Sequence, residues 1–218
     1  MTFGILSYGG YVPTLRIARQ TIAQAIAWAV PSARGQKGER SFASWDEDSI
    51  TLAVEAARNC LAGLEVAPAQ VQLASTTLPF ADRSNSGVVA DALQLGNAVG
   101  TEDLAGSRRA ATSALARLGR AAAGGPATLL LSADCRETRP GSAQEMLYGH
   151  GAAAMLVGEG EPVALIRGVA AVHEDLVDQY RATDSDYDYA LEERWIREEG
   201  YNKIVPQAVQ AAAAAAGV

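Results

Sequence analysis

The sequence predicts an α/β domain in which helices flank a mixed β-sheet. Three observations lead to this prediction. Apolar residues recur at helical spacing between Asp48 and Leu64. A continuous apolar run, ATLLLSAD at residues 127–134, is typical of a strand buried on both faces. Helical and strand-like segments alternate along most of the chain, and 49% of the 218 residues are hydrophobic, which is enough for a buried core.

The N-terminal elements begin with a predicted strand, TFGILSYG at residues 2–9. It continues through YVPTLRIA into an apolar helix from about Arg16 to Ala29. The next segment, residues 31–48, is rich in Gly, Ser and charged residues, and we expect a loop there. The helix from Asp48 to Leu64 is the clearest in the chain, because acidic residues precede it where the helix dipole favours them.

The following elements alternate more tightly. We expect a strand at 71–76, a helix at 87–95, a strand at 101–106, a helix from Ser107 to Gly124-Gly125 and the buried strand at 127–134. Residues 152–170 resemble two strands joined by a turn, which predicts a β-hairpin.

The composition changes near residue 172. Residues 1–172 form the predicted α/β domain, whereas 173–218 are charged and aromatic and predict a helical connector or tail. Helical stretches are expected there around Tyr187 to Glu199 and Lys203 to Ala216.

The charge balance limits the range of partners. A net charge of −7 argues against a broad nucleic-acid or anionic-membrane surface, so any anion site has to be local. The longest apolar runs are too short to span a bilayer and the N-terminus has no secretory pattern, so we expect a cytoplasmic protein. Cys60 and Cys135 show neither metal-ligand nor disulfide spacing. Cys60 is expected to be buried; a reactive thiol at Cys135 is the less favoured interpretation of that residue.

One junction carries unusual chemistry. In GSRRAATSAL, residues 106–115, Ser107 can cap a helix, and Arg108 and Arg109 lie in its first turn, where the helix dipole disfavours cations. A strand followed directly by a helix start suits an activated nucleophile or a bound anion, so Ser107, Arg108 and Arg109 are candidate ligand-binding residues. The alternative is a capped helix with solvated arginines. GHGAAA at 149–154 precedes a strand, so His150 is expected in a turn rather than at a nucleotide.

Several segments together resemble one family. GILSYGGYVP, WDEDSITLAVEAARNCL, GSRRAATSAL and GHGAAAMLVG are similar, in order and spacing, to the N-terminal half of the hydroxymethylglutaryl-CoA synthases. They are closer still to the bacterial and archaeal synthase-like proteins of the thiolase superfamily. The resemblance covers essentially the whole chain, since ERWIREEGYNKIVPQAV resembles the connector after the first half. It implies a thiolase-like layered fold, of which this chain is one of two stacked halves.

The resemblance also implies a site with altered chemistry. In that family a cysteine at the start of the central helix attacks an acyl-CoA, in the pattern Cys, any residue, two small residues and Thr. This pattern falls on residues 108–112, so the nucleophile position is Arg108. The family's general acid/base Glu precedes a Pro-aromatic pair, and that position is Thr76, before Pro79-Phe80. The family's catalytic His belongs to the second half, which would follow where this chain ends.

These departures predict a truncated chain or a non-catalytic subunit in CoA-dependent acyl transfer. The resemblance implies no permanent cofactor and no metal, with acyl-CoA as a substrate or ligand. It implies a homo-oligomer or a heteromer with a thiolase-type chain, and association with a small zinc-ribbon and OB-fold protein. Two alternatives stay open: a non-enzymatic scaffold that keeps the fold for oligomerisation, and an enzyme whose nucleophile is Cys135.

Overall fold

A six-stranded mixed sheet forms the centre of the computed structural model, which describes residues 2–31, 37–121 and 125–218. In spatial order the strands are β5 (Gly100–Leu104), β4 (Gln70–Ala74), β6 (Thr128–Asp134), β7 (Gly151–Gly160), β1 (Thr2–Tyr11) and β8 (Ala164–Leu165). β4 pairs in parallel with β5 and β6, and the other pairs are antiparallel. The predicted α/β class with a mixed sheet is therefore confirmed.

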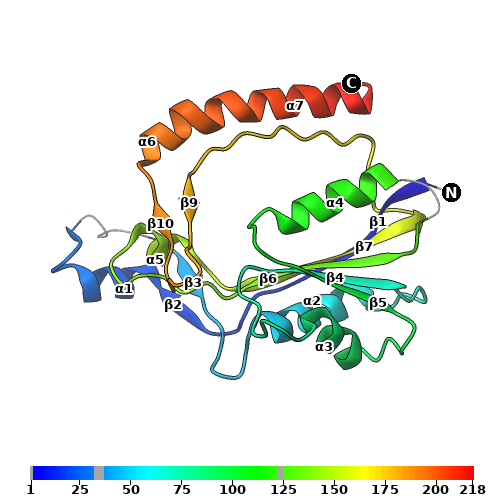
Figure 1. The fold of residues 1–218 in the computed structure, drawn as a ribbon. Coiled ribbons are helices and arrows are strands. Elements are labelled where there is room, and N and C mark those ends of the chain that lie inside the picture. The colour runs from blue at the N-terminus through cyan, green and yellow to red at the C-terminus, as the bar shows by residue number, and fades with distance from the viewer. Residues whose placement is uncertain (1, 32–36, 122–124) are drawn as a thin grey trace.

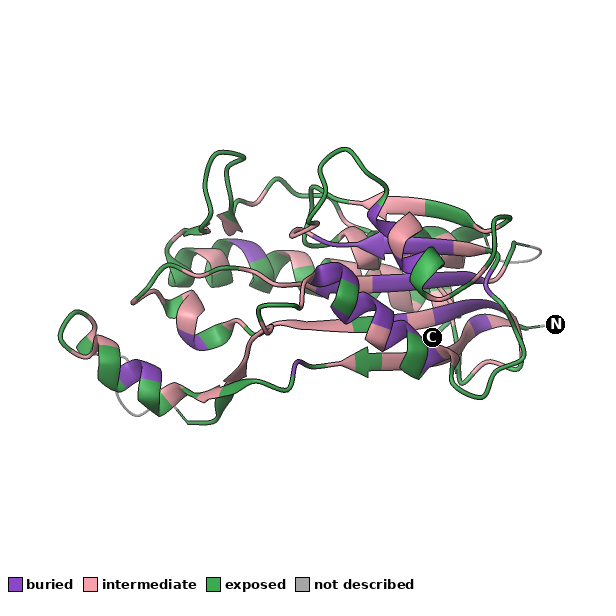
Figure 2. Cartoon of the chain, turned by 90° about the horizontal axis from the view of Figure 1, so that it is seen from below, coloured by how far each residue is buried: buried purple, intermediate pink, exposed green. Residues whose placement is uncertain are grey.

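Helices cover both faces of this sheet (Figure 1). α2 (Ser49–Leu61) and α3 (Asn85–Ala92) lie on one face, and α4 (Ala110–Ala121) lies on the other. The main core is between α2 and the sheet, where Leu52, Leu73 and Leu129 are fully buried. Figure 2, which views that face, shows the buried residues gathered in the strands and in the helix over them.

α2 confirms the clearest helix prediction. Asp48 caps it, because its carboxylate accepts the Thr51 N–H while the Thr51 hydroxyl accepts the Asp48 N–H. Gly9 on β1 allows the helix to approach the sheet closely: a Cβ there would lie 2.4 Å from the Cys60 nitrogen. Cys60 is buried in this contact, as predicted.

A smaller unit lies beside the sheet and corrects two predictions. β2 (Arg16–Ala18) pairs with β3 (Glu39–Ser41), which falls inside the predicted loop, so helix α1 (Arg19–Ile26) begins three residues later than expected. Tertiary pairing with a distant segment has overridden the local helical pattern. Helix α5 (Ala143–Leu147) completes the unit, with Met146 packed against Ile22 of α1.

The predicted hairpin at 152–170 is wrong. β7 and β8 do not pair with each other, because β1 lies between them: Gly4 is opposite both Gly158 of β7 and Leu165 of β8. The chain turns at 161–163, where the Val163 N–H donates to the Ile5 carbonyl. A long apolar partner strand has displaced the local pairing.

After β8 the chain leaves the sheet and returns over the α4 side (Figure 1). β9 (Gln179–Tyr180) and β10 (Tyr189–Ala190) pair with each other, so the helix expected from Tyr187 begins only at α6 (Glu193–Trp195). A π-helical turn (Ile196–Tyr201) leads into α7 (Asn202–Ala216), which confirms the helix predicted from Lys203. Part of the stop signal predicted at Gly124-Gly125 lies outside the described residues.

Candidate functional site

A small cleft lies where β4 and β6 end and α4 begins. Carboxyl ends of parallel strands share one edge of a sheet, which brings Thr76, Ser107, Arg108 and Asp134 together in its lining. Three of the four residues expected at the site therefore meet there, namely Thr76, Ser107 and Arg108, whereas Arg109 is not among the lining residues. The cleft has a volume of about 10 Å³, room for about one water molecule.

Asp134 organises the floor of the cleft. Its Oδ1 accepts the Thr76 N–H at 2.7 Å and the Thr76 hydroxyl at 2.9 Å, and the hydroxyls of Ser75 and Thr77 at 3.1 Å. This carboxylate ties the end of β4 to the end of β6. The Thr76 side chain is thus committed to a structural hydrogen bond.

The start of α4 differs from the prediction. The helix begins at Ala110, so Arg108 and Arg109 occupy a turn before it rather than its first turn. Gly106, with φ of +81°, makes that turn possible, and the Ser107 hydroxyl accepts the Arg109 N–H at 3.2 Å. Both residues lie directly before the N-terminus of α4, so the helix dipole still disfavours their positive charge.

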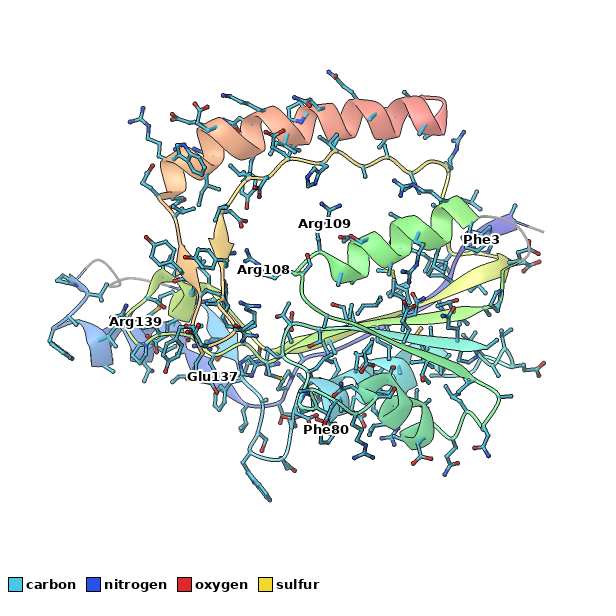
Figure 3. The ribbon with its side chains drawn as sticks, viewed as in Figure 1. Phe3, Phe80, Arg108, Arg109, Glu137 and Arg139 are labelled. Carbon is cyan, nitrogen blue, oxygen red and sulfur yellow. The ribbon has the colours of Figure 1, made fainter. Side chains whose placement is uncertain are left out.

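Arg108 extends from this turn toward β9 (Figure 3). Its Nη2 donates to Asp178 Oδ1 at 3.1 Å and to the Gln179 carbonyl at 2.8 Å. Burial raises the pKa of Asp178, but hydrogen bonds from Tyr201 and the Gln179 N–H, with the charge of Arg108, outweigh burial and leave that pKa below its ordinary value. The charge of Arg108 is therefore balanced within the chain.

Arg109 has a different environment. Its side chain stands away from Arg108 toward the C-terminal part of the chain (Figure 3), and its Nε donates to the Ser113 hydroxyl at 3.3 Å. The residue is exposed. Only one of the two candidate arginines thus lines the cleft.

A second ion pair lies beside the cleft and was not predicted. Arg136 pairs with Asp188, with side chains only 13% and 3% exposed, and Arg136 also donates to the Thr76 hydroxyl. The Tyr148 hydroxyl donates to Asp188 Oδ2 at 2.7 Å. Burial, followed by Asp188, raises the pKa of Tyr148. The one sequence signal is that Arg136 lies two residues after the end of a buried strand.

Cys135 is poorly suited to act as a nucleophile. Burial, followed by the nearby carboxylates of Asp48, Asp134 and Glu47, raises the pKa of its thiol to about 12. The thiolate is the reactive form, so this thiol is unreactive at neutral pH.

The two histidines lie outside the cleft lining. His150 precedes β7, as predicted, and its Nδ1 accepts the Ala43 N–H at 2.9 Å while Nε2 lies 3.2 Å from the Arg136 carbonyl. These contacts fit a neutral ring protonated on Nε2. His173 is exposed. Within the described ranges, no group of three or more His, Cys, Asp or Glu side chains is placed to hold a metal ion, and no helix is long and apolar enough to cross a bilayer.

The chain is similar to curated proteins of one kind. It is 31% identical over 191 residues to the hydroxymethylglutaryl-CoA synthase of Pyrococcus horikoshii, covering 84% of this chain and 53% of that protein. It is 33% identical over 177 residues to the synthase of Aeropyrum pernix, covering 78% of this chain and 47% of that protein. The chain thus spans about half the length of these relatives. No family model matches it.

Solved structures share its fold. A hydroxymethylglutaryl-CoA synthase complexed with CoA superposes with a TM-score of 0.79 at 19% identity, covering all of this chain and 57% of that one. PksG, a hydroxymethylglutaryl-CoA synthase from Bacillus subtilis, gives 0.77 at 20% identity over 99% of this chain and 55% of that one. 3-Oxoacyl-(acyl carrier protein) synthase III from Pseudomonas aeruginosa gives 0.62 at 25% identity, over 74% and 51%.

Proposed function

Because the chain is a hydroxymethylglutaryl-CoA synthase-like member of the thiolase superfamily, we propose that it takes part in CoA-dependent acyl transfer without a nucleophile of its own. It forms one α/β half of a two-half assembly, and a thiolase-type partner supplies the reacting groups. Its ligand is CoA or an acyl-CoA, held at the edge of the cleft by Ser107, Arg108 and Arg109.

One observation carries this proposal. The resemblance places Arg108 at the family's nucleophile position, and its guanidinium stays protonated in proteins and is hydrogen-bonded to Asp178 and Gln179. It cannot attack an acyl carbon. Thr76, which the resemblance places at the family's acid/base position, is hydrogen-bonded to Asp134, and a hydroxyl cannot act as a general acid or base at neutral pH as a carboxylate can.

The uneven burial of the helices supports a second half. In the described part of the chain, α2 has eight buried residues, whereas α4 has only Ala114. Tyr8 alternates with Gly9, which faces α2, so Tyr8 lies on the α4 face of the sheet, where it is 72% exposed. A second α/β unit packed on this side of the sheet would cover both α4 and Tyr8.

The test is whether the chain forms an acyl-enzyme. We expect no mass increase after incubation with acetyl-CoA or acetoacetyl-CoA, as measured by intact mass spectrometry. A Cys135→Ser variant is the matched control. An adduct present in the wild type and lost in that variant would make the chain an enzyme with Cys135 as its nucleophile and overturn the proposal.

A scaffold without ligand is the second candidate. The internal pair between Arg108 and Asp178 favours it, because the cation in the cleft already has an anion. Calorimetric titration with CoA separates the two functions: saturable binding at a one-to-one ratio supports the proposal, and association without any CoA binding supports the scaffold.

A further inference from the structure

The segment from Asp178 to Ala190 contains β9 and β10 and is called the strap here. We infer that the strap closes the cleft over Arg108, with its aspartates acting as internal anions, and that it has to be released before an external anion can reach this guanidinium. The closure of the cleft is inferred from the contacts of the strap alone. Only the identity of the external anion rests on the proposed function.

Three guanidinium contacts hold the strap against the cleft. Arg108, from the turn before α4, binds Asp178 and the Gln179 carbonyl at one end. Arg136, which follows β6, binds Asp188 at the other end. Between them Arg181, from the strap itself, donates to the carbonyl of Thr76. The strap is thus fixed to the same strand ends and helix start that form the cleft.

The strap has little structure that would hold it in place without these contacts. β9 and β10 pair through only two residues each, in a sheet separate from the main one. A two-stranded hairpin is marginal in water without packing against other elements. The ring centroids of Tyr180 and Tyr189 lie 5.6 Å apart with the ring planes tilted by 43°, and both residues are more than half exposed. Besides the three guanidinium contacts, called the anchors here, the Tyr148 hydroxyl lies 2.9 Å from Gln179 Oε1 and the Tyr201 hydroxyl donates to Asp178 Oδ2 at 2.7 Å. The position of the strap therefore depends on side-chain contacts, of which the anchors are the charged ones.

The two charged anchors differ in strength. The pair between Arg136 and Asp188 is buried, and Asp188 Oδ2 also accepts the Tyr148 hydroxyl, so removing Asp188 leaves a buried cation unpaired. The pair between Arg108 and Asp178 is about one third exposed, where ion pairs contribute little and exchange partners readily. Asp188 is the anchor that fixes the strap, and Asp178 is the carboxylate that an external anion would replace.

Hydrogen exchange measured by mass spectrometry tests the closure. In an Asp188→Asn variant, amides of residues 178–190 should exchange about tenfold faster or more, as expected for loss of a charge-assisted bond, while β6 keeps its wild-type protection. Asp186→Asn makes the same charge change in the strap at an exposed residue and should exchange as the wild type does. If exchange in the strap is unchanged in Asp188→Asn, or if β6 is accelerated as much as the strap, the proposed closure is overturned. Asp178→Asn serves as a second variant at a more exposed anchor if Asp188→Asn does not fold.

Calorimetric titration with CoA and with pyrophosphate tests whether Asp178 keeps external anions from binding Arg108. Asp178→Asn should bind both probes about tenfold more tightly than wild type and Asp186→Asn, and Arg108→Ala should remove the gain. Equal affinity in wild type and Asp178→Asn would show that Asp178 does not mask Arg108. Faster exchange in Asp188→Asn with no binding in any variant would leave the closure in place and reject the proposed CoA ligand.

Discussion

At the scale of single residues, the site shows what local sequence can and cannot predict. Thr76 and Arg108 meet because each follows a strand of the same parallel set, and both strands were expected within two residues of their observed bounds. The anion that pairs with Arg108 could not be predicted, because Asp178 lies 70 residues further along the chain. Asp188 lies 52 residues beyond Arg136 in the same way. Nothing near these acids in the sequence indicates a partner.

The Arg108–Asp178 pair leads to a prediction for stability. Both side chains are about one third exposed, so Arg108→Ala, Asp178→Asn and the double variant should each lower the free energy of unfolding by less than about 1 kcal/mol, with a coupling energy of similar size. Urea denaturation of the wild type, the two single variants and the double variant gives the four free energies of this double-mutant cycle. A coupling of several kcal/mol would contradict a weak, exchangeable anchor.

His150 leads to a prediction for pH dependence. Burial lowers its pKa and Arg40 adds to this, against smaller opposing effects of the Arg136 carbonyl and of Glu137 and Glu47. The unfolded chain therefore binds a proton at a higher pH than the folded chain does. The free energy of unfolding should fall as pH drops below the ordinary value of 6.5, through the lowered pKa of the folded state.

Denaturation between pH 7 and pH 5 measures this effect. His150→Asn keeps an acceptor near the Ala43 N–H without titrating in this range, so its stability should change less with pH. His173→Asn alters an exposed ring and should follow the wild type. Identical pH slopes for wild type and His150→Asn would rule out this histidine as the cause.

At the scale of elements, predictions were correct where the local sequence contains the whole signal. α2 has its own cap, its own periodicity and a buried face, and β6 has a continuous apolar run, so both lie where they were expected. The elements that differ from the prediction are strands whose pairing partners lie far away in the sequence. β2 pairs with β3 across α1, and β1 separates β7 from β8. No local pattern distinguishes a strand beside its neighbour in sequence from one beside a strand over 150 residues away.

The contact between α2 and β1 gives a prediction with a matched control. Gly9→Ala would place a Cβ 2.4 Å from the Cys60 nitrogen and 2.5 Å from the Ala56 carbonyl oxygen, both backbone atoms that cannot move independently of the helix. The free energy of unfolding should fall by about 1–3 kcal/mol. Gly10→Ala has only the Ala152 carbonyl oxygen near, at 3.7 Å, and should lie within about 1 kcal/mol of wild type. Equal effects of the two variants in urea denaturation would show that the close approach is not needed.

At the scale of the whole molecule, the two faces of the sheet are unequal. One is covered by α2 and α3 over a dense core, and the other carries α4, with α7 beyond it (Figure 1). The chain spans about half of its relatives, and the less covered face is the one that holds the cleft and the strap. A partner on that face would therefore cover apolar surface and lie against Arg108 at once.

The last prediction concerns this face. Exposed apolar surface of this kind favours association, so we expect the chain to self-associate at micromolar concentration, with a dimer as the smallest closed assembly. Light scattering and sedimentation velocity measure the mass. Tyr8→Glu introduces a charge on the α4 face and should shift the protein toward monomer, because desolvating an unpaired carboxylate opposes burial of that face. Leu64→Glu adds the same charge just beyond the end of α2, at an exposed position on the other side of the sheet, and should leave the mass distribution unchanged. A wild-type monomer across this range would contradict self-association. A dimer weakened by Leu64→Glu but not by Tyr8→Glu would place the contact on the opposite face.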